Sequence, residues 1–204
     1  MIIETICEPE GFAPAIHGMR NPMDSWDKSD SILLFGDLYV GGKDKELSIK
    51  LQKAGPEHCK HLRMIFVWAD ITAPRYWWNE FDTYRNGVEK VSCSTMHKLM
   101  ARPLSVNDFA SDENENELRK IVDIINGKMK EYNETKDETK KKKIWRQIIQ
   151  LLPQSYMQKR TVCMSYAALR NIIRQRKGHK LNEWACFIDW VYGLKNSWMI
   201  TDEL

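Results

Sequence analysis

The sequence predicts a single α+β domain spanning residues 1–204, and three observations support this prediction. The composition is that of a globular protein with a sizeable core, since 43% of the residues are hydrophobic and 29% are charged. Segments rich in β-branched and aromatic residues occupy the first half of the chain and are typical of strands. Helical periodicity dominates the second half, and no internal repeat or linker divides the two halves.

Two apolar segments of the first half predict strands: residues 31–40 (SILLFGDLYV) and residues 62–74 (LRMIFVWADITAP). The stretch between them predicts a short helix that ends at Gly55, because glycine is well suited to a helix C-cap. The helical spacing places on one face Leu47, Leu51 and Ala54. We therefore expect a strand, a short helix and a second strand in this order.

A helix is expected to begin at Pro74, since the fixed φ of proline suits the first helical turn, and to end near Asn86 and Gly87. Aromatic and charged side chains would share its surface. One stripe consists of Trp77, Phe81 and Arg85, and the adjacent stripe of Glu80 and Tyr84. Two interpretations stay open: a core helix packed through its rings, and a surface on which a flat ligand stacks.

The second half predicts two pairs of helices. Residues 105–143 indicate two charged helices joined by a polar turn, and residues 165–194 indicate two consecutive helices interrupted at Gly178. The apolar positions of the first pair are Leu118, Ile121, Val122, Ile125 and Met129. Those of the second pair are Leu169, Ile172 and Ile173, with Arg170, Arg174 and Lys177 pointing elsewhere.

Charge and hydropathy exclude several classes of protein. The formal charge of +3 is too small to indicate a nucleic-acid partner, and the basic run at residues 140–143 is explained as a solvated helix face. No apolar run approaches the roughly 20 residues that a membrane helix needs. The N-terminal residues do not resemble a signal peptide. We therefore expect a cytoplasmic protein with no membrane partner.

The five cysteines are widely spaced and form no CxxC pair, which is typical of reduced thiols rather than of disulfides or a zinc site. His58 and His61 have no acidic residue or third histidine at a spacing typical of a metal site, so no metal is expected. Cys93 and His97 have the residue types of a nucleophile and its base, but a thiol in a loop explains Cys93 equally simply.

Two further segments have side chains suited to an anion. Residues 92–97 (SCSTMH) could expose backbone N–H groups to a phosphate, or form an ordinary polar turn. Arg176, near Asn171, could hold a phosphate or the imide edge of a pyrimidine through its guanidinium fork. The alternative for Arg176 is a solvated basic helix end.

Taken together, these segments resemble the flavin-dependent thymidylate synthases. The family pattern R-H-R, seven residues, then S-x-R fits without a gap, with Thr83-Tyr84-Arg85 at R-H-R and Cys93-Ser94-Thr95 at S-x-R. Glu80 falls at the glutamine of the preceding Pro-led helix, and His58 at the glycine-histidine position upstream. Downstream, the matching residues are Leu152, Pro153, Leu169, Asn171, Arg176, His179 and Glu183, while Ser165 and Ala167 depart from the pattern.

The resemblance implies a mixed sheet with long helices and a homotetramer that binds FAD and dUMP at its interfaces. Hydride from NADPH and a methylene group from methylenetetrahydrofolate would convert dUMP to dTMP. The resemblance also implies flavin contacts from His58, Tyr84, Arg85 and Asn171. It implies contacts to a pyrimidine nucleotide from Glu80, Ser92, Cys93, Ser94 and Arg176. No catalytic residue is assigned.

Two functions therefore remain open. The first is flavin-dependent methylene or methyl transfer to a uracil nucleotide, favoured by the retained Arg85, Asn171 and Arg176. The second is a homologue that has lost the reaction and binds, senses or sequesters a nucleotide, favoured by the altered R-H-R and S-x-R motifs. Only Arg85 of the R-H-R triplet is kept, so binding is expected to survive better than turnover.

Overall fold

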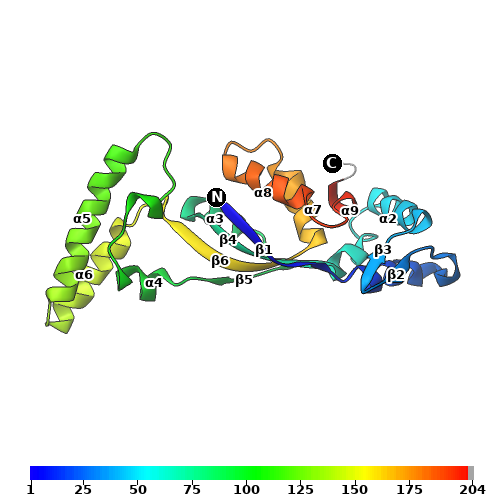
Figure 1. Ribbon diagram of the computed structural model, residues 1–204, viewed down its shortest axis with the longest axis horizontal. Coiled ribbons are helices and arrows are strands. Elements are labelled where there is room, and N and C mark those ends of the chain that lie inside the picture. Colours follow the sequence, from blue (N-terminus) through cyan, green and yellow to red (C-terminus); the bar gives the residue numbers. More distant parts are fainter. Residues whose placement is uncertain (202–204) are drawn as a thin grey trace. The chain divides into compact units, whose positions relative to one another are not determined.

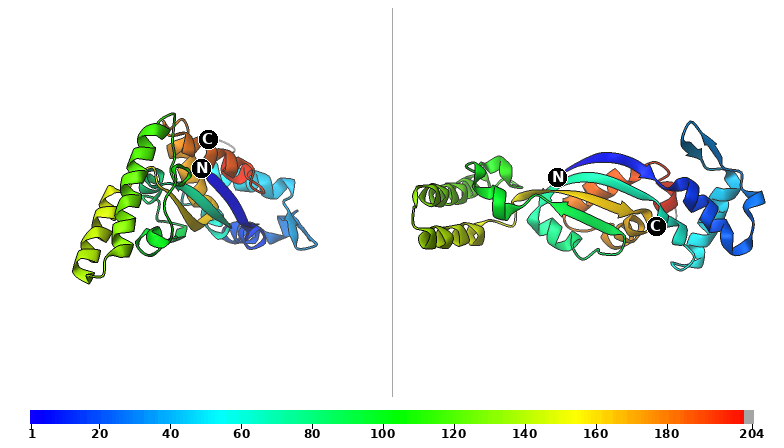
Figure 2. Two further views of the ribbon diagram at one scale, coloured as in Figure 1. Left: turned by 60° about the vertical axis from the view of Figure 1, so that its left-hand side comes forward. Right: turned by 90° about the horizontal axis from the view of Figure 1, so that it is seen from below.

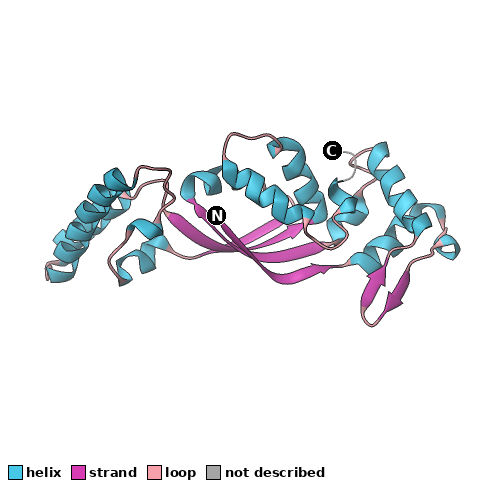
Figure 3. Cartoon of the chain, turned by 45° about the horizontal axis from the view of Figure 1, so that its top comes forward, coloured by secondary structure: helices cyan, strands magenta, loops and turns pink. Residues whose placement is uncertain are grey.

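The computed structural model describes residues 1–201, without the side chain of His97, and combines a four-stranded sheet with helices. The strands are β1 (Ile2–Glu10), β4 (Phe66–Pro74), β5 (Val88–Ser92) and β6 (Met157–Ser165). Their order in the sheet is β1-β4-β6-β5, and Figure 3 shows these strands in magenta. The mixture of sheet and helix confirms the predicted α+β class.

The chain forms two compact units, and each is described here by itself. The first comprises Met1–Ile2, Ile71–Thr83 and Val91–Arg160; the second comprises Ile3–Asp70, Tyr84–Lys90 and the described residues from Thr161 onward. Each strand of the four-stranded sheet contributes residues to both units. We therefore keep a single domain over residues 1–204 as a proposal.

The first unit contains a helical hairpin of α5 (Glu115–Glu134) and α6 (Glu138–Leu151), which lie side by side in Figures 1 and 2. Asp137 begins α6 by accepting hydrogen bonds from the N–H groups of Thr139 and Lys140 at 2.8 and 3.2 Å. The buried side chains of the pair include Leu118, Val122, Ile125, Met129, Ile144 and Ile148. The predicted charged helix pair is confirmed, although Ile121 is 39% exposed and lies outside the buried stripe.

Helix α3 (Arg75–Phe81), also in the first unit, is shorter than predicted. Its rings Trp77, Trp78 and Phe81 are all 0% exposed, and Trp78 Nε1 donates to the backbone oxygen of Gln158 at 2.8 Å. These three rings are core, so the interpretation of them as a stacking surface is wrong. The helix ends at Phe81 rather than near Gly87, because the Thr83 hydroxyl and N–H both donate to the Glu80 carbonyl and close a turn there.

The second unit contains α1 (Phe12–Arg20), α2 (Gly42–Ala54), α7 (Tyr166–Arg176), α8 (Asn182–Tyr192) and α9 (Trp198–Thr201). The consecutive helices α7 and α8 are confirmed, and the chain between them contains Gly178 with φ +75°. Their buried residues include Leu169, Ile172, Ile173, Trp184 and Phe187. The N-terminal half also packs here, since Phe12 meets the ring of Tyr166 edge-on at 5.6 Å.

Helix α2 ends at Ala54, directly before Gly55 as predicted, but its fully buried face is polar: Leu47 and Leu51 of the predicted apolar face are half-buried, and Ala54 is exposed. Its buried residues are Asp44, Ser48 and Gln52. Asp44 Oδ1 accepts from Arg20 Nε at 2.6 Å, and its Oδ2 accepts from the hydroxyls of Ser29 and Ser31 at 2.6 Å. Burial alone would raise the pKa of Asp44, but these hydrogen bonds outweigh burial and the pKa lies below its ordinary value.

Residues 31–40 form a hairpin rather than the single predicted strand. Strand β2 (Ile32–Leu34) pairs antiparallel with β3 (Asp37–Tyr39). The turn between them has φ +52° at Phe35 and +87° at Gly36, the pair of positive angles that a two-residue hairpin requires. The prediction of a strand over residues 62–74 holds from Phe66, whereas residues Lys60–Met64 form a 3₁₀ helix.

Short helical segments complete the chain. They are α4 (Thr95–Lys98) and the 3₁₀ turns Asn21–Met23, Trp26–Lys28, Leu99–Ala101 and Val106–Asp108. Within residues 1–201, no helix is both long enough and apolar enough to cross a membrane.

Candidate functional site

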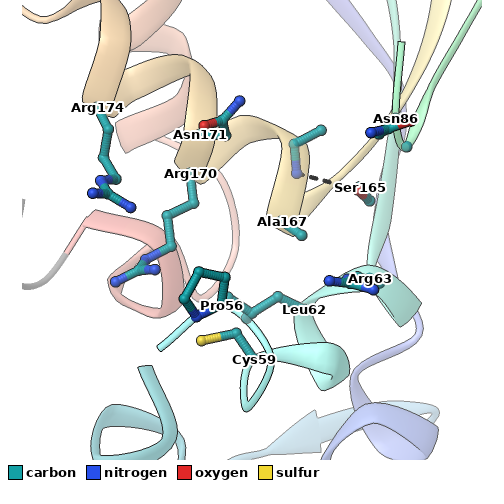
Figure 4. Close-up of a pocket in the computed structure, with 12 residues that line it drawn as sticks. Pro56, Cys59, Leu62, Arg63, Asn86, Ser165, Ala167, Arg170, Asn171 and Arg174 are labelled. Atoms are coloured by element: carbon teal, nitrogen blue, oxygen red, sulfur yellow. Dashed lines mark hydrogen bonds between the residues drawn. The ribbon is translucent and has the colours of Figure 1, made fainter. Parts of the chain in front are cut away.

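A pocket of about 470 Å³ lies in the second unit, where three segments meet. Helix α7 forms one wall, residues 56–63 form another, and the Asn86-Gly87 turn forms a third. Figure 4 shows the side chains that line it. Because the three segments are far apart in the sequence, the pocket exists only in the folded chain.

The start of α7 is fixed by a hydrogen bond within its first turn and by two hydrogen bonds to other segments. Ser165 is the N-cap, and its hydroxyl accepts from the N–H of Ala168 at 3.2 Å. The N–H of Tyr166 donates to the oxygen of Ile65 at 2.9 Å, and that of Ser165 donates to the oxygen of Gly87 at 2.8 Å. The positive end of an 11-residue helix therefore borders the pocket in a defined place.

Only glycine fits at position 87. Its φ is +71°, and a Cβ there would lie 2.3 Å from Ser165 Oγ, well inside any tolerated contact. The close approach brings the turn that holds Asn86 against the start of α7. Gly87 thus allows the Asn86-Gly87 turn to pack directly against the N-cap of α7.

Three arginines give the pocket its charge. Arg170 and Arg174 are four residues apart on α7, which puts them on one helix face, and Arg63 lies on a different segment across from Arg170 (Figure 4). Arg170 Nε is buried and has no hydrogen-bond partner within the described chain. Within residues 1–201, no carboxylate forms an ion pair with any of the three, and no acidic side chain lines the pocket.

Two titratable side chains lie close to Arg170. Burial raises the pKa of the Cys59 thiol, although the positive charge of Arg170 opposes this, so Cys59 is a thiol at neutral pH. His61 is 3% exposed, with Nε2 2.9 Å from Ser48 Oγ. Burial, assisted by the charge of Arg170, lowers the pKa of His61 to about 4. His61 is therefore neutral, and the positive charge at this end of the pocket comes from the arginines.

Stability should fall in mild acid because of His61. Its pKa is 6.5 when unfolded and about 4 when folded, so its contribution is complete above pH 6.5 and is lost as the pH falls toward 4. We expect the free energy of unfolding to drop by about 2 kcal/mol between pH 7.5 and pH 5. Urea unfolding at the two pH values measures this. In His61→Gln most of the drop should disappear; an equal drop in both proteins would show that other groups cause it.

Among the sequence-predicted residues, Asn171 lines the pocket. His58 is exposed and lies 3.6 Å from the carboxylate of Glu57, beside the pocket residue Cys59. Arg85 is exposed, directly before the turn at Asn86. These three predicted flavin contacts therefore border one region of the second unit, with only Asn171 inside the cavity.

Tyr84 and Arg176 are brought together, which the sequence did not predict. Arg176 Nε donates to the Tyr84 hydroxyl at 2.8 Å, and that hydroxyl lies 3.1 Å from Gln175 Oε1. The Arg176 guanidinium also lies over the ring of Trp184, 4.7 Å from its centroid. Tyr84 is only 8% exposed, so its hydroxyl lies within the fold, where it holds Arg176.

The other predicted nucleotide contacts belong to the first unit. Ser92 ends β5, and Cys93 and Ser94 follow it, with Ser92 and Cys93 exposed and Ser94 and Glu80 half-buried. The Cys93 N–H donates to the oxygen of Lys159 at 2.9 Å, and its carbonyl accepts from Gln158 Nε2 at 2.8 Å. Residues 92–97 are therefore a strand end followed by α4, and the Cys93 N–H is already bonded.

Two further possibilities raised by the sequence are a Cys93–His97 catalytic pair and a metal site. The side chain of His97 lies outside the described part of the chain, so its pairing with Cys93 stays open. Among the described residues, no group of three His, Cys, Asp or Glu side chains is arranged to hold a metal ion.

Sequence reasoning did not assign the pocket arginines to a site. Arg170 and Arg174 were noted only as the polar face of an amphipathic helix, and their spacing of four was the available signal. Arg63 gave no signal, because its place opposite α7 depends on the tertiary fold.

Comparison with known proteins identifies the fold. No protein-family model matches this chain, and no curated protein matches it. Two solved structures cover it almost completely. One is thymidylate synthase X (ThyX) from Helicobacter pylori with FAD and dUMP, with a TM-score of 0.75, 16% identity, and 99% of this chain and 98% of that chain covered. The other is flavin-dependent thymidylate synthase ThyX from the same organism complexed with FAD and dUMP, with a TM-score of 0.72, 17% identity and both chains covered completely. At this identity the likeness shows the fold, and it confirms the predicted thymidylate-synthase-like architecture.

Proposed function

We propose that this protein binds a flavin and transfers a methylene or methyl group to a uracil nucleotide. The observation that carries the proposal is an arginine-lined pocket at the start of α7, in a fold whose solved examples hold FAD and dUMP. The proposal places the protein in the cytoplasm, with no nucleic-acid or membrane partner.

The residues of the pocket fit a phosphate-bearing cofactor. The buried Arg170 Nε has no partner in the described chain, and an anion at this place would supply one. Asn171 and the three arginines would hold the cofactor, with His58, Tyr84 and Arg85 as the further proposed contacts. A bound FAD would carry the electron chemistry, with NADPH and methylenetetrahydrofolate as proposed co-substrates. The protein supplies position and charge.

Arg176 is the proposed main contact to the uracil nucleotide. Its guanidinium is held from two sides, by the Tyr84 hydroxyl and by the face of Trp184. A guanidinium fixed in this way loses little rotamer freedom when it binds a phosphate or an imide edge. Glu80 and Ser92 to Ser94, in the first unit, stay further proposed contacts to a pyrimidine nucleotide.

A second candidate function is nucleotide binding without turnover. Two structural observations favour it. Tyr84, at the middle position of R-H-R, is buried, and its hydroxyl accepts a hydrogen bond from Arg176. Ala167, which falls at the arginine of the family segment N-x-R-S-L-x-N, lines the pocket with a methyl group. Both changes remove charge from the region where the flavin is proposed to bind.

The absorption spectrum of the purified protein tests the proposal. Bound oxidised flavin should give visible absorption bands, or the protein should acquire them after incubation with FAD and gel filtration. Lysozyme treated in the same way is the control for free flavin carried through the column. A colourless protein that takes up no added FAD would contradict flavin chemistry and favour the second candidate.

We also expect a homotetramer. Each unit exposes large apolar side chains that a monomer leaves in water: Ile124 of α5 is 57% exposed, and at the hairpin Leu33 is 61% exposed and Phe35 wholly exposed. Light scattering at micromolar concentration should give four times the monomer mass of 24.0 kDa. The monomer mass itself at that concentration would refute the expectation.

A further inference from the structure

The β2–β3 hairpin exposes apolar side chains on both of its faces. Its antiparallel register puts Ile32 opposite Tyr39 and Leu33 opposite Leu38, and side chains alternate between the two faces along each strand. Ile32 and Tyr39 are exposed on one face, and Leu33 is exposed on the other. Figures 2 and 3 show the hairpin at the margin of the second unit. A contiguous apolar surface of this kind marks a site of interaction.

The hairpin is held in one arrangement despite this exposure. The Ser31 hydroxyl, directly before β2, donates to Asp44 at 2.6 Å and accepts from the N–H of Gly41 at 3.0 Å. Asp37, at the start of β3, forms an ion pair with Lys195. A two-stranded sheet is only marginally stable by itself, so these contacts keep its faces preorganised. Such a surface loses little conformational entropy when a partner covers it.

A groove of about 390 Å³ lies where the hairpin meets the end of β1 and the start of α1. Leu33 and Leu38 of the hairpin line it, together with apolar residues of the other segment that include Pro9 and Phe12. All the lining residues belong to the second unit. The groove shares no lining residue with the arginine pocket, so it is a separate feature of the described chain.

The rim of the groove is acidic. Glu8 and Glu10 line it and are exposed, and within residues 1–201 neither forms an ion pair. A hydrogen bond to Glu10 raises the pKa of the Cys7 thiol, and the negative charges of Glu10 and Glu8 add to this rise. The cation that lines the groove, Lys195, is already paired with Asp37. Two negative charges therefore stand uncompensated beside an apolar wall.

This charge distinguishes between the possible occupants. A self-complementary contact with a second copy through the groove would bring Glu8 and Glu10 toward their own counterparts, and like charges repel. Anionic lipids and nucleic acids would be repelled in the same way. A polypeptide with lysine or arginine among apolar residues matches both the rim and the wall.

We propose that this groove is a docking site for an extended, basic peptide segment of another protein. Its apolar side chains pack on Leu33 and Leu38, and its lysine or arginine side chains pair with Glu8 and Glu10. An extended segment suits the site, because each hairpin strand has only one neighbouring strand within the described chain, and alternate side chains of the segment can meet different surfaces. The proposal does not depend on nucleotide chemistry. It leaves the expected homotetramer to other apolar surfaces, such as Ile124 of α5.

Fluorescence anisotropy with short, capped, labelled peptides tests the proposal. In the three probes, valine alternates with lysine, valine with glutamate, and serine with lysine. We expect the valine–lysine peptide to bind at least about tenfold more tightly than the others, which lack either the charge or the apolar side chains. Its affinity should fall as the ionic strength rises. Equal affinity for all three peptides, or no binding of the valine–lysine peptide, would overturn the proposal.

Variants assign the affinity to the groove. Leu33→Ser, and the pair Glu8→Gln with Glu10→Gln, should each weaken binding of the valine–lysine peptide by about tenfold. The two glutamates are exposed, so the paired variant should fold even if Leu33→Ser does not. Matched controls in the other unit are Leu151→Ser and Glu117→Gln, both at exposed positions, and they should bind as the parent does. Parent affinity in the groove variants would refute the proposal.

Two further measurements detect other occupants. A lower mass of Leu33→Ser than of the parent in light scattering would show that a second copy covers the groove. Co-sedimentation of the parent, but not of Leu33→Ser, with phosphatidylcholine vesicles would assign the groove to a lipid surface. Either result would refute the peptide site, whereas an unchanged mass and no co-sedimentation would support it. FAD and dUMP binding should be equal in parent and groove variants, so this proposal and the proposed function can fail separately.

Discussion

Replacing Arg176 with alanine is expected to weaken the binding of a pyrimidine nucleotide by about 2 to 5 kcal/mol, the range for losing a desolvated, charge-assisted bidentate contact. In the structure, the Arg176 guanidinium is fixed by the Tyr84 hydroxyl at 2.8 Å and by the ring of Trp184. Such a preorganised cation binds an anion without losing much rotamer freedom. Calorimetry with dUMP measures the effect.

Controls separate binding from packing. Arg176→Ala also removes the contact with Trp184, which is fully buried, so some loss of stability is expected. Arg176→Met keeps an apolar stem beside Trp184 but has no charge and no donors. It should be nearly as stable as the parent and bind dUMP as weakly as Arg176→Ala. If both variants bind dUMP with the parent affinity, Arg176 is not part of the nucleotide site.

Amphipathic helices were the most predictable part of this fold. Leu118, Val122, Ile125 and Met129 recur at helical spacing, and they are buried on α5 because the only apolar face of a charged helix must pack inward. For α2 the same reasoning located the helix but not its buried face, since Leu47 and Leu51 are only half-buried. Its buried face is polar, since Asp44 is satisfied by Arg20 and by two serine hydroxyls contributed by a distant loop. Periodicity cannot reveal such partners.

Strands and turns were predicted less well, for local reasons. The positive φ angles at Phe35 and Gly36 fold one apolar run into a hairpin, and a phenylalanine there gives no turn signal. Strand β6 (Met157–Ser165) carries polar and charged residues, Gln158, Lys159 and Arg160, that do not alternate cleanly with apolar ones. Arg160 is accommodated by stacking over Trp78 at 4.3 Å and pairing with Asp82 at 2.8 Å.

The candidate site, too, could be predicted only in part, because tertiary packing brings its residues together. The sequence singled out Asn171, which lines the pocket, and Arg176, which lies outside it in contact with Tyr84. It did not single out Arg63, because a residue in a 3₁₀ turn becomes a pocket residue only when α7 packs beside that turn. The ring-rich helix that suggested a flat ligand proved to be core, since burial explains tryptophan as readily as stacking does.

Thymidylate formation from dUMP, NADPH and methylenetetrahydrofolate is expected to be weak or undetectable. Where the family pattern has two cations and an imidazole, this chain has Thr83, Tyr84 and Arg85, and therefore a single cation. The Tyr84 hydroxyl is also occupied by Arg176. Removing one charge-assisted hydrogen bond from the reacting complex should cost on the order of 2 to 4 kcal/mol, or roughly 30-fold to 1,000-fold in rate.

The S-x-R segment adds to the expected fall in rate. Cys93 and Thr95 stand where the family has serine and arginine, and a backbone N–H could in principle replace a missing side-chain donor to phosphate. At Cys93 this is not possible without rearrangement, because its N–H donates to the oxygen of Lys159 at 2.9 Å. We therefore expect the two changes together to leave little turnover, while nucleotide binding through Arg176 is expected to be retained.

Tritium release from 5-tritiated dUMP measures this turnover, beside an active flavin-dependent thymidylate synthase as the positive control. We expect dUMP to bind, and tritium to be released at less than about a thousandth of the control rate. Thr83→Arg restores one missing cation at an exposed position, and it should raise the rate if the missing charge is the cause. A parent rate comparable to the control would show instead that Tyr84, with its hydrogen bond to Arg176, replaces the family imidazole in the reaction.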